Sequence, residues 1–406
     1  MATFVPPEND RELVQVVSDQ IKRGMYMAYP DRPWLETPFL FQGFILDGDD
    51  IINQVKRECR FIYVDMGKSW ARRRPKPPKV AGPDKYPTTK PVEEVFENAY
   101  ARRRDTLDEI KRALIGVERG DGINVTKVRE QVKTCVDSIV ENPNAMLWLG
   151  KLRNKDEYTA EHCLNVGILA IALGRHLGLD RVKLETLGMC GMLHDVGKMK
   201  VDQSILNKPG RLTEEEFEVI KTHTTEGKQI LQKDRHLPRE VIEAAFGHHE
   251  RIDGSGYPRG MESATLHLFT RIISIVDCYD AITTNRCYDQ SRPATEAIKV
   301  LFTFRDKQFD GWLVEQFIAC LGIYPTGSLV ELFTGEGAVV IDSNKTSRLH
   351  PKVTIVLDEL KHYRQPLTVD TKAYEEEPES RTIRQVLDEN EFNIDLEQIF
   401  SHFRKR

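Results

Sequence analysis

The sequence lacks three features that would place the chain outside the cytoplasm or brace it covalently. No hydrophobic run approaches the length needed to span a bilayer. The first residues lack the basic start and apolar stretch of a signal peptide. The seven cysteines are odd in number and never spaced as CxxC, which argues against a disulfide framework and a structural zinc site. We therefore expect a cytoplasmic protein with no membrane partner.

The sequence also lacks an excess of positive charge, because the formal net charge is −5. Nothing in the overall charge attracts nucleic acid, and we expect no such partner. An anionic substrate would need positive charge supplied locally, by metal ions or by a few Lys and Arg side chains. With 406 residues, of which 40% are hydrophobic, the chain is long enough for two or three domains.

The N-terminal part has the composition of a small domain followed by a linker. Residues 1–70 contain short runs of β-forming residues with a turn signal at 48–50, and they predict a small β-rich domain. Residues 71–91 contain Arg72-Arg73-Arg74 and six prolines, which predicts a linker. A nucleic-acid or membrane contact is the less favoured interpretation of this segment, because proline interrupts the basic cluster.

The remainder of the chain is mainly helical by its hydrophobic spacing. Residues 92–140 predict connecting helices whose apolar stripes pack on the following domain, with a homodimer as the alternative. Residues 141–345 predict an all-helical domain, which includes a capping box at 213–216. From about residue 327 the chain returns to extended runs such as 338–341 and 353–357. Residues 346–406 predict a short extended C-terminal tail, with a short helix near 394–403. The expected fold class is therefore mainly α, with a small β-rich domain in front.

Histidine and aspartate recur on helices of this domain at positions that ought to be apolar. They are His162, His194-Asp195, His223, His248-His249 and Asp277. A hydrogen-bonded histidine is the commoner explanation for any one of them, but here five of the eleven histidines would each need it. A buried ionised aspartate costs several kcal/mol unless it is paired or binds a cation.

Neutral imidazoles and carboxylates are the ligand set of borderline divalent metals such as iron, manganese, nickel and zinc. Five histidines and two aspartates exceed what one tetrahedral ion uses. One carboxylate that bridges two ions accounts for the surplus, and such a pair can activate water and hold a phosphate in line. The residues alone thus favour a two-ion site for phosphate chemistry.

The order of these residues resembles the HD-GYP subfamily of the HD phosphohydrolases. The resemblance rests on His162, the string HDVGK at 194–198, His223, the string HHERIDGSGYP at 248–258 and Asp277. It covers roughly residues 140–345, and the flanking runs ILNKPG at 205–210, DAIT at 280–283 and LGIYPTGS at 321–328 agree with it. Residues 15–66 resemble the uncharacterised domain found before many HD-GYP domains.

The resemblance implies an all-helical hydrolase that lowers a second messenger in bacterial signalling. The expected reaction is metal-dependent cleavage of c-di-GMP to linear pGpG, or on to GMP. The implied ligands of one ion are His162, His194, Asp195 and Asp277. Those of the second are His223, His248 and His249, with Asp195 bridging. Asp195 and Lys198 are the implied catalytic residues, and Lys198 would neutralise the scissile phosphate or orient the nucleophile. An exposed lysine favoured by the helix dipole is the alternative for Lys198.

The resemblance also assigns roles in the loop after His249. The residues concerned are Glu250, Asp253, Gly254, Gly256, Tyr257 and Pro258. Asp253 would orient a ligand histidine, the two glycines would let the loop turn tightly, and Tyr257 would pack on a guanine or on a partner protein. Signalling proteins of the GGDEF type are the partners implied for this loop.

The chain departs from the family pattern in two places. Tyr158 stands where some members have a glutamate for a third metal, so we expect two ions, iron or manganese before nickel or zinc. The phosphate-contacting run Arg-Pro-Tyr-Lys reads Arg286-Cys287-Tyr288-Asp289 here. Arg286 is kept as a substrate contact, whereas Asp289 would weaken binding of a dianion by about 1 kcal/mol.

Two cysteines lie beside the candidate ligands in the sequence. Cys163 and Cys190 are either thiolate ligands or, as we prefer, inert buried thiols.

Three other functions are alternatives to hydrolysis of c-di-GMP. The first is a c-di-GMP receptor or scaffold with little catalysis, which Asp289 keeps open. A di-iron oxygenase is a weaker alternative, against which the GYP loop and Arg286 argue. A nucleotidase for monomeric nucleotides is weaker still.

Overall fold

The computed structural model divides the chain into two compact units, residues 1–79 and 80–406. It describes the following residues: 13–32, 34, 37–39, 43–46, 48–66, 69, 80–151, 157–262, 265–284, 291–344, 347, 349–374, 377, 380–387 and 392. The two units are described separately below.

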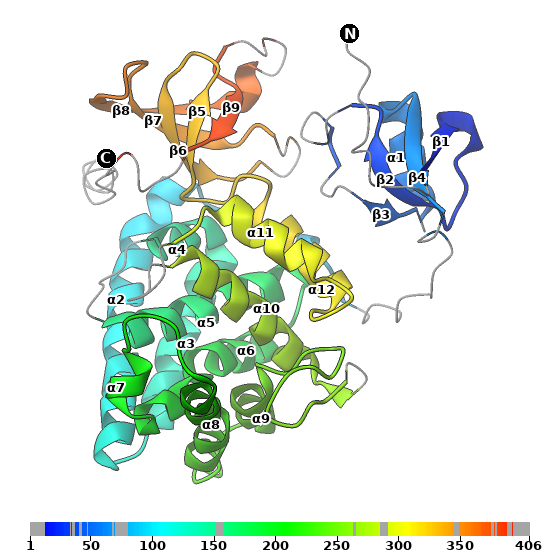
Figure 1. The fold of residues 1–406 in the computed structure, drawn as a ribbon. Helices are drawn as coiled ribbons and strands as arrows, with labels where there is room; N and C mark the ends of the chain where they lie inside the picture. Colours follow the sequence, from blue (N-terminus) through cyan, green and yellow to red (C-terminus); the bar gives the residue numbers. More distant parts are fainter. Residues whose placement is uncertain are drawn as a thin grey trace. The chain divides into compact units, whose positions relative to one another are not determined.

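The N-terminal unit is a four-stranded antiparallel sheet of order β1-β4-β2-β3 with one helix (Figure 1). Its elements are β1 (Leu13–Val17), β2 (Tyr26–Pro30), β3 (Phe44–Ile45), α1 (Asp49–Glu58) and β4 (Phe61–Asp65). Met27, Ile62 and Val55 are fully buried in its core. The expected β-rich domain is confirmed, but the predicted turn at 48–50 is wrong. Asp49 and Asp50 begin α1 instead, where acidic side chains favour the positive end of the helix dipole.

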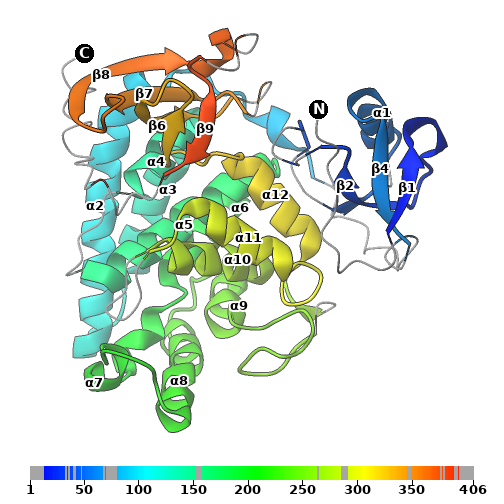
Figure 2. The same ribbon diagram turned by 45° about the horizontal axis from the view of Figure 1, so that its top comes forward.

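The second unit is a helical body that carries a sheet near its C-terminal end (Figure 2). Its helices are α2 (Val92–Arg119), α3 (Val125–Glu141), α4 (Pro143–Leu149), α5 (Tyr158–His176), α6 (Arg181–Leu193), η5 (Val196–Lys200), α7 (Gln203–Leu206), α8 (Glu214–Leu231), α9 (Arg239–Gly247), α10 (Leu268–Thr283), α11 (Ala294–Thr303) and α12 (Gly311–Leu321). Helices α2 and α3 contact α4, α5 and each other, and α3 also contacts α6, so the helices predicted over 92–140 pack on the body. Nothing in this packing tests the homodimer.

Helix α5 is the central helix of this body, since nearly all its residues after Thr159 are buried. It packs on α6 at two glycines, Gly167 and Gly191. A Cβ added at Gly191 would lie 2.6 Å from the Cα of Gly167, closer than atoms can approach. Glycine therefore lets the two backbones touch. This contact fixes the spacing of His162 on α5 and His194 at the end of α6.

The C-terminal part of the second unit is a five-stranded antiparallel sheet of order β8-β7-β6-β5-β9. Its strands are β5 (Leu329–Leu332), β6 (Gly337–Asp342), β7 (Lys352–Leu357), β8 (Tyr363–Asp370) and β9 (Ile383–Val386). Strand β6 contacts α4, where Asn144 Nδ2 donates to Asp342 Oδ1; Thr326, just before β5, donates its hydroxyl to Asn144 Oδ1 at 3.2 Å. The predicted boundary at 345/346 falls between β6 and β7, and the predicted helix at 394–403 lies outside the described residues.

Among the residues that the structure describes, none of the helices combines the length and the apolar character that crossing a bilayer requires.

Candidate metal centre

Three helices bring the first group of candidate ligands together. His162 comes from α5, Asp277 from α10, and His194 is the residue that ends α6. His162 Nε2 lies 3.1 Å from Asp277 Oδ1, and His194 Nε2 lies 3.8 Å from the same oxygen. All three residues are buried. The facing atoms of the three lie within 4.8 Å of one another, which is a spacing that one ion can bridge.

A second group lies beside the first and consists only of histidines. His223 comes from α8, which opens with the predicted capping box between Thr213 and Glu216. His248 and His249 directly follow α9. His223 Nε2 lies 3.3 Å from His248 Nε2, and one nitrogen of each of the three lies within 4.8 Å of the others.

Asp195 lies between the two groups and faces both. Its Oδ2 is 3.5 Å from His162 Nε2 and 3.3 Å from His194 Nε2. Its Oδ1 is 3.4 Å from His223 Nε2 and 3.6 Å from His248 Nε2. Each oxygen of one carboxylate therefore points at a different group, which is the geometry of a bridging ligand.

Backbone carbonyls orient three of the rings. The Nδ1 atoms of His194 and His223 lie 2.7 and 2.6 Å from the carbonyls of Gly191 and Ile220. His248 Nδ1 lies 3.1 Å from the carbonyl of Ala245. A carbonyl can only accept, so each Nδ1 must donate its proton, and each Nε2 keeps its lone pair toward the centre. This is the tautomer that binds a metal.

Asp280 holds His162 in the same way, and the sequence analysis did not assign it a role. His162 Nδ1 lies 2.8 Å from Asp280 Oδ2, and both residues are about 99% buried. Asp280 follows Asp277 by three residues on α10, so the two carboxylates share one face of the helix. That spacing was the signal that could have identified it.

Burial and neighbouring charge set the protonation of the cluster. Burial lowers the pKa of His223 to about 3, and it lowers the pKa values of His248 and His249 as well. Burial alone would raise the pKa of Asp195, but His194 and Lys198 hold it well below the ordinary value. The outcome in the second group is neutral imidazole beside the ionised Asp195 carboxylate, which is the state in which both side chains bind metals. Burial alone would lower the pKa of His162, but Asp277 and Asp280 raise it above the ordinary value.

Two buried polar atoms of the cluster lack, in the described part of the chain, a partner that a cation could supply. His194 Nε2 and Asp195 Oδ1 have no hydrogen-bond partner among the described residues. A buried polar atom left this way is costly. An ion in the first group would take up His194 Nε2, and an ion in the second group would take up Asp195 Oδ1, so the donor set fits metal ions.

Lys198 is placed at the centre and not at an exposed helix end. Its ammonium group pairs with Asp195 Oδ2, and only 19% of its side chain is exposed. Burial would lower the pKa of Lys198, but the Asp195 carboxylate raises it above its ordinary value. A permanent positive charge therefore stands beside the bridging carboxylate.

Glu250 holds the loop after His249 from inside. Its Oε1 accepts the backbone N–H of Arg259 at 2.8 Å, and its Oε2 accepts that of Met261 at 2.9 Å. Gly256 is required at its place, because an added Cβ would lie 2.3 Å from the nitrogen of Arg251. Gly254 turns the chain with a φ of +80°.

The structure does not give Asp253 the orienting role expected of it. Asp253 is exposed, and its Oδ1 accepts the backbone N–H and the hydroxyl of Ser255 at 3.0 and 2.6 Å. Its carboxylate is used to shape the loop, and Asp280 is the carboxylate that orients a histidine. Tyr257, by contrast, stacks on His249 with ring centroids 4.7 Å apart.

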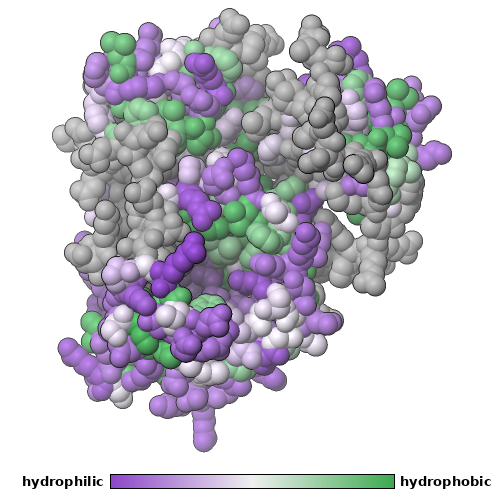
Figure 3. All heavy atoms as spheres, in the orientation of Figure 1, coloured by the Kyte–Doolittle hydropathy of each residue, from purple (hydrophilic) through white to green (hydrophobic). Residues whose placement is uncertain are grey.

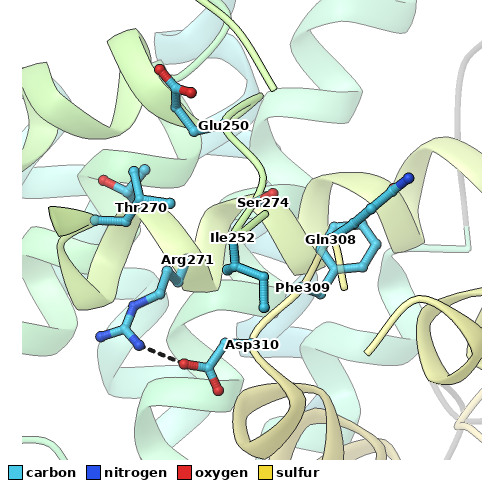
Figure 4. Close-up of a pocket in the computed structure, with 9 residues that line it drawn as sticks. Glu250, Ile252, Thr270, Arg271, Ser274, Gln308, Phe309 and Asp310 are labelled. Carbon is cyan, nitrogen blue, oxygen red and sulfur yellow. Dashed lines mark hydrogen bonds and ion pairs between the residues drawn. The ribbon is translucent and has the colours of Figure 1, made fainter. Parts of the chain in front are cut away.

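Behind this loop lies a small pocket, with a cavity volume of only about 10 Å³. Arg271 and Asp310 line it as an ion pair (Figure 4), together with Glu250 and Ser274, and Arg271 Nη1 lies 2.5 Å from Asp310 Oδ2. The loop is tied to the same region because the backbone N–H of Ile252 donates to the carbonyl of Gln308 at 3.1 Å. The pocket therefore belongs to the support of the loop.

The remaining predicted positions lie beside the centre or outside the described residues. Tyr158 stacks on His162, with centroids 5.9 Å apart and planes 6° apart. Cys163 and Cys190 are buried, burial raises both thiol pKa values, and neither belongs to a group of candidate ligands among the described residues. The predicted substrate contact Arg286 and its neighbour Asp289 lie outside the described residues.

Comparison with known proteins finds two family models and a long curated relative. An "HD domain" model matches residues 145–313, and a "Domain of unknown function (DUF3391)" model matches residues 13–142. A cyclic di-GMP phosphodiesterase of Pseudomonas aeruginosa is 32% identical over 84% of this chain and 85% of its own length. A cyclic di-GMP phosphodiesterase of Thermotoga maritima is 35% identical over 40% of this chain and 45% of its own.

A further relative is named for a different cyclic dinucleotide. A 3'3'-cGAMP-specific phosphodiesterase of Vibrio cholerae is 38% identical over 39% of this chain and 36% of its own length.

Proposed function

The chain belongs to the HD-GYP family of cyclic di-GMP phosphodiesterases, and from this premise we propose that it hydrolyses c-di-GMP to linear pGpG. The observation that carries the proposal is the position of Asp195, whose two oxygens face two separate groups of imidazoles. A bridged pair of ions is the arrangement suited to in-line displacement at a phosphodiester.

We assign one ion to His162, His194, Asp195 and Asp277, and the second to His223, His248, His249 and Asp195. Iron or manganese is the first choice for both, and nickel or zinc the second. Tyr158 stacks on His162 and stands at the position where a glutamate would be needed to bind a third ion. We therefore propose two ions. When bound, the ions supply Lewis acidity and lower the pKa of a water molecule.

The protein side chains have defined tasks in the hydrolysis. Asp195 holds the two halves of the centre together, and Asp280 fixes the ring of His162. Lys198, beside Asp195, supplies a positive charge for the scissile phosphate. Water attacks phosphorus in line, the bond to the 3′ oxygen breaks, and the leaving oxygen takes up a proton. Arg286 and Tyr257 are the proposed substrate contacts.

Several finer statements belong to the proposal. Hydrolysis on to GMP, a cytoplasmic location, a homodimer and contact with GGDEF-type proteins through the GYP loop are predictions. The domain boundaries after residues 70, 91, 140 and 345 are also predictions.

The test is the double substitution H194A/D195A in the full-length protein loaded with Mn²⁺ or, under anaerobic conditions, Fe²⁺. We expect bound metal and formation of pGpG from c-di-GMP both to be lost, measured by elemental analysis and by chromatography. The matched control is H362A/D358A, which removes an exposed His–Asp pair with 3.6 Å between Nδ1 and Oδ2. Full activity in H194A/D195A, or no pGpG from the metal-loaded wild type, would contradict the proposal.

A further inference from the structure

An aromatic pair extends from the second group of histidines toward the surface. The ring of Tyr257 stacks on that of His249, with centroids 4.7 Å apart and planes 29° apart. The ring of Phe217 meets Tyr257 edge-on, with centroids 6.2 Å apart and planes 83° apart. The candidate ligand His249 therefore contacts Tyr257, and Tyr257 in turn contacts Phe217.

Phe217 is the exposed end of this row. It lies on α8, the helix that also carries His223, and 43% of it is exposed. In Figure 3, hydrophobic side chains reach the surface near α7 and α8 among hydrophilic neighbours. A single exposed phenylalanine is ordinary on a protein surface. Phe217 differs because its ring contacts the ring that covers a candidate metal ligand.

Lys221 lies over both rings and pairs with a carboxylate of the same helix. Its Nζ is 4.8 Å from the centroid of Phe217 and 5.5 Å from that of Tyr257. The same Nζ lies 2.6 Å from a carboxylate oxygen of Glu218. The two aromatic rings offer apolar contact surface, which suits a flat ring. A cation over the rings also holds them in place.

We propose that Phe217, Tyr257 and Lys221 form a stacking subsite for a purine base of the cyclic dinucleotide. This rests on the proposed function and adds to it a binding role for α8. In a cyclic dinucleotide each base is attached to a ribose next to a phosphate, so a base lies beside the phosphate held at the centre. Aromatic stacking accepts guanine and adenine alike. The subsite therefore accepts purine dinucleotides without distinguishing guanine from adenine.

The test compares F217A with F217W and with F304A in the full-length, metal-loaded protein. Phe304 is the matched control because it is a phenylalanine of similar exposure, 38%, and contacts neither group of candidate ligands by any ring contact among the described residues. We expect F217A to raise KM for both c-di-GMP and 3'3'-cGAMP by about tenfold, since stacking on one side chain is worth that much. Metal content and kcat should stay near wild type. F217W should restore KM, and F304A should not change it.

Two results would overturn the subsite. One is an unchanged KM in F217A with normal metal content, which would mean that Phe217 contacts a protein partner or only packs against its neighbours. The other is a loss of metal with a fall in kcat, which would make Phe217 a support of His223. If the wild type hydrolyses neither dinucleotide, the proposed function fails on its own. The subsite is then judged by calorimetric binding of c-di-GMP, where an unchanged Kd in F217A contradicts it.

Discussion

Asp280 holds the ring of His162 from the side that faces away from the proposed ions. The two residues are separated by 118 positions, yet His162 Nδ1 lies 2.8 Å from Asp280 Oδ2. This contact turns His162 Nε2 toward Asp277, 3.1 Å away. A carboxylate behind a ligand histidine fixes its tautomer and increases its basicity.

The first prediction follows from this contact. D280A should weaken Mn²⁺ binding by about 10–100-fold, and D280N by less, because an amide oxygen still accepts from Nδ1 but carries no charge. Isothermal titration with Mn²⁺ measures both. D370N, which alters an exposed aspartate at the end of β8, is the control. Equal Mn²⁺ affinity in D280A and D370N would contradict the role of Asp280.

The second prediction concerns Gly197, where η5 touches α8. A Cβ at this position would lie 1.9 Å from the carbonyl oxygen of His223 and 2.5 Å from the nitrogen of Gly227. G197A must therefore push α8 away from the segment that carries Asp195. We expect a loss of about 1–3 kcal/mol in the free energy of unfolding together with weaker metal binding.

Thermal unfolding and elemental analysis of G197A give the two values. G48A is the control, because the nearest atom to its added Cβ is 3.9 Å away, in Ile51, and its φ of −121° suits alanine. A G197A protein as stable as G48A and with full metal content would show that η5 can move freely.

Four of the seven candidate ligands lie in two local strings of residues, whereas His162, His223 and Asp277 stand singly in the sequence. HDVGK at 194–198 and HHERIDGSGYP at 248–258 name their members without any knowledge of the fold. The sequence alone could not show which carboxylate faces which imidazole ring. Asp280 is brought to His162 only by the packing of α10 on α5, whereas Asp253 lies near the histidines in sequence but turns toward Ser255.

The sequence is weaker for the sheets and for α1. Strand β9 pairs with β5 across about fifty residues, and both are four residues long. So short a run has little signal of its own, and its pairing depends on tertiary packing. Helix α1 was missed because aspartate is a poor helix former, although it is favoured in the first turn.

The third prediction separates Glu250 from Asp253. E250Q replaces two acceptor oxygens by one, so a backbone N–H of Arg259 or Met261 loses its partner. We expect a cost of about 1–3 kcal/mol in unfolding and a raised KM, since the loop carries Tyr257. D253N, at an exposed site, should change stability by less than about 0.5 kcal/mol. Metal loss in D253N comparable to that in D280A would return the orienting role to Asp253.

The fourth prediction concerns a buried ion pair beside the centre. Arg103 on α2 and Glu161 on α5 lie 2.5 Å apart, with 8% and 5% of their side chains exposed. Glu161 directly precedes His162, so the pair fixes α2 against the part of α5 that enters the centre. E161A would leave a buried guanidinium without its carboxylate, which costs about 3–5 kcal/mol.

The double substitution R103M/E161M should be more stable than E161A, because it removes both charges and fills the space with apolar side chains. Calorimetric unfolding of the three proteins measures the difference. The exposed pair of Arg181 and Asp137, about half exposed at both ends, is the control, and D137A should change stability by no more than about 1 kcal/mol. If E161A and D137A lose the same small amount, the buried pair does not hold α2 on α5.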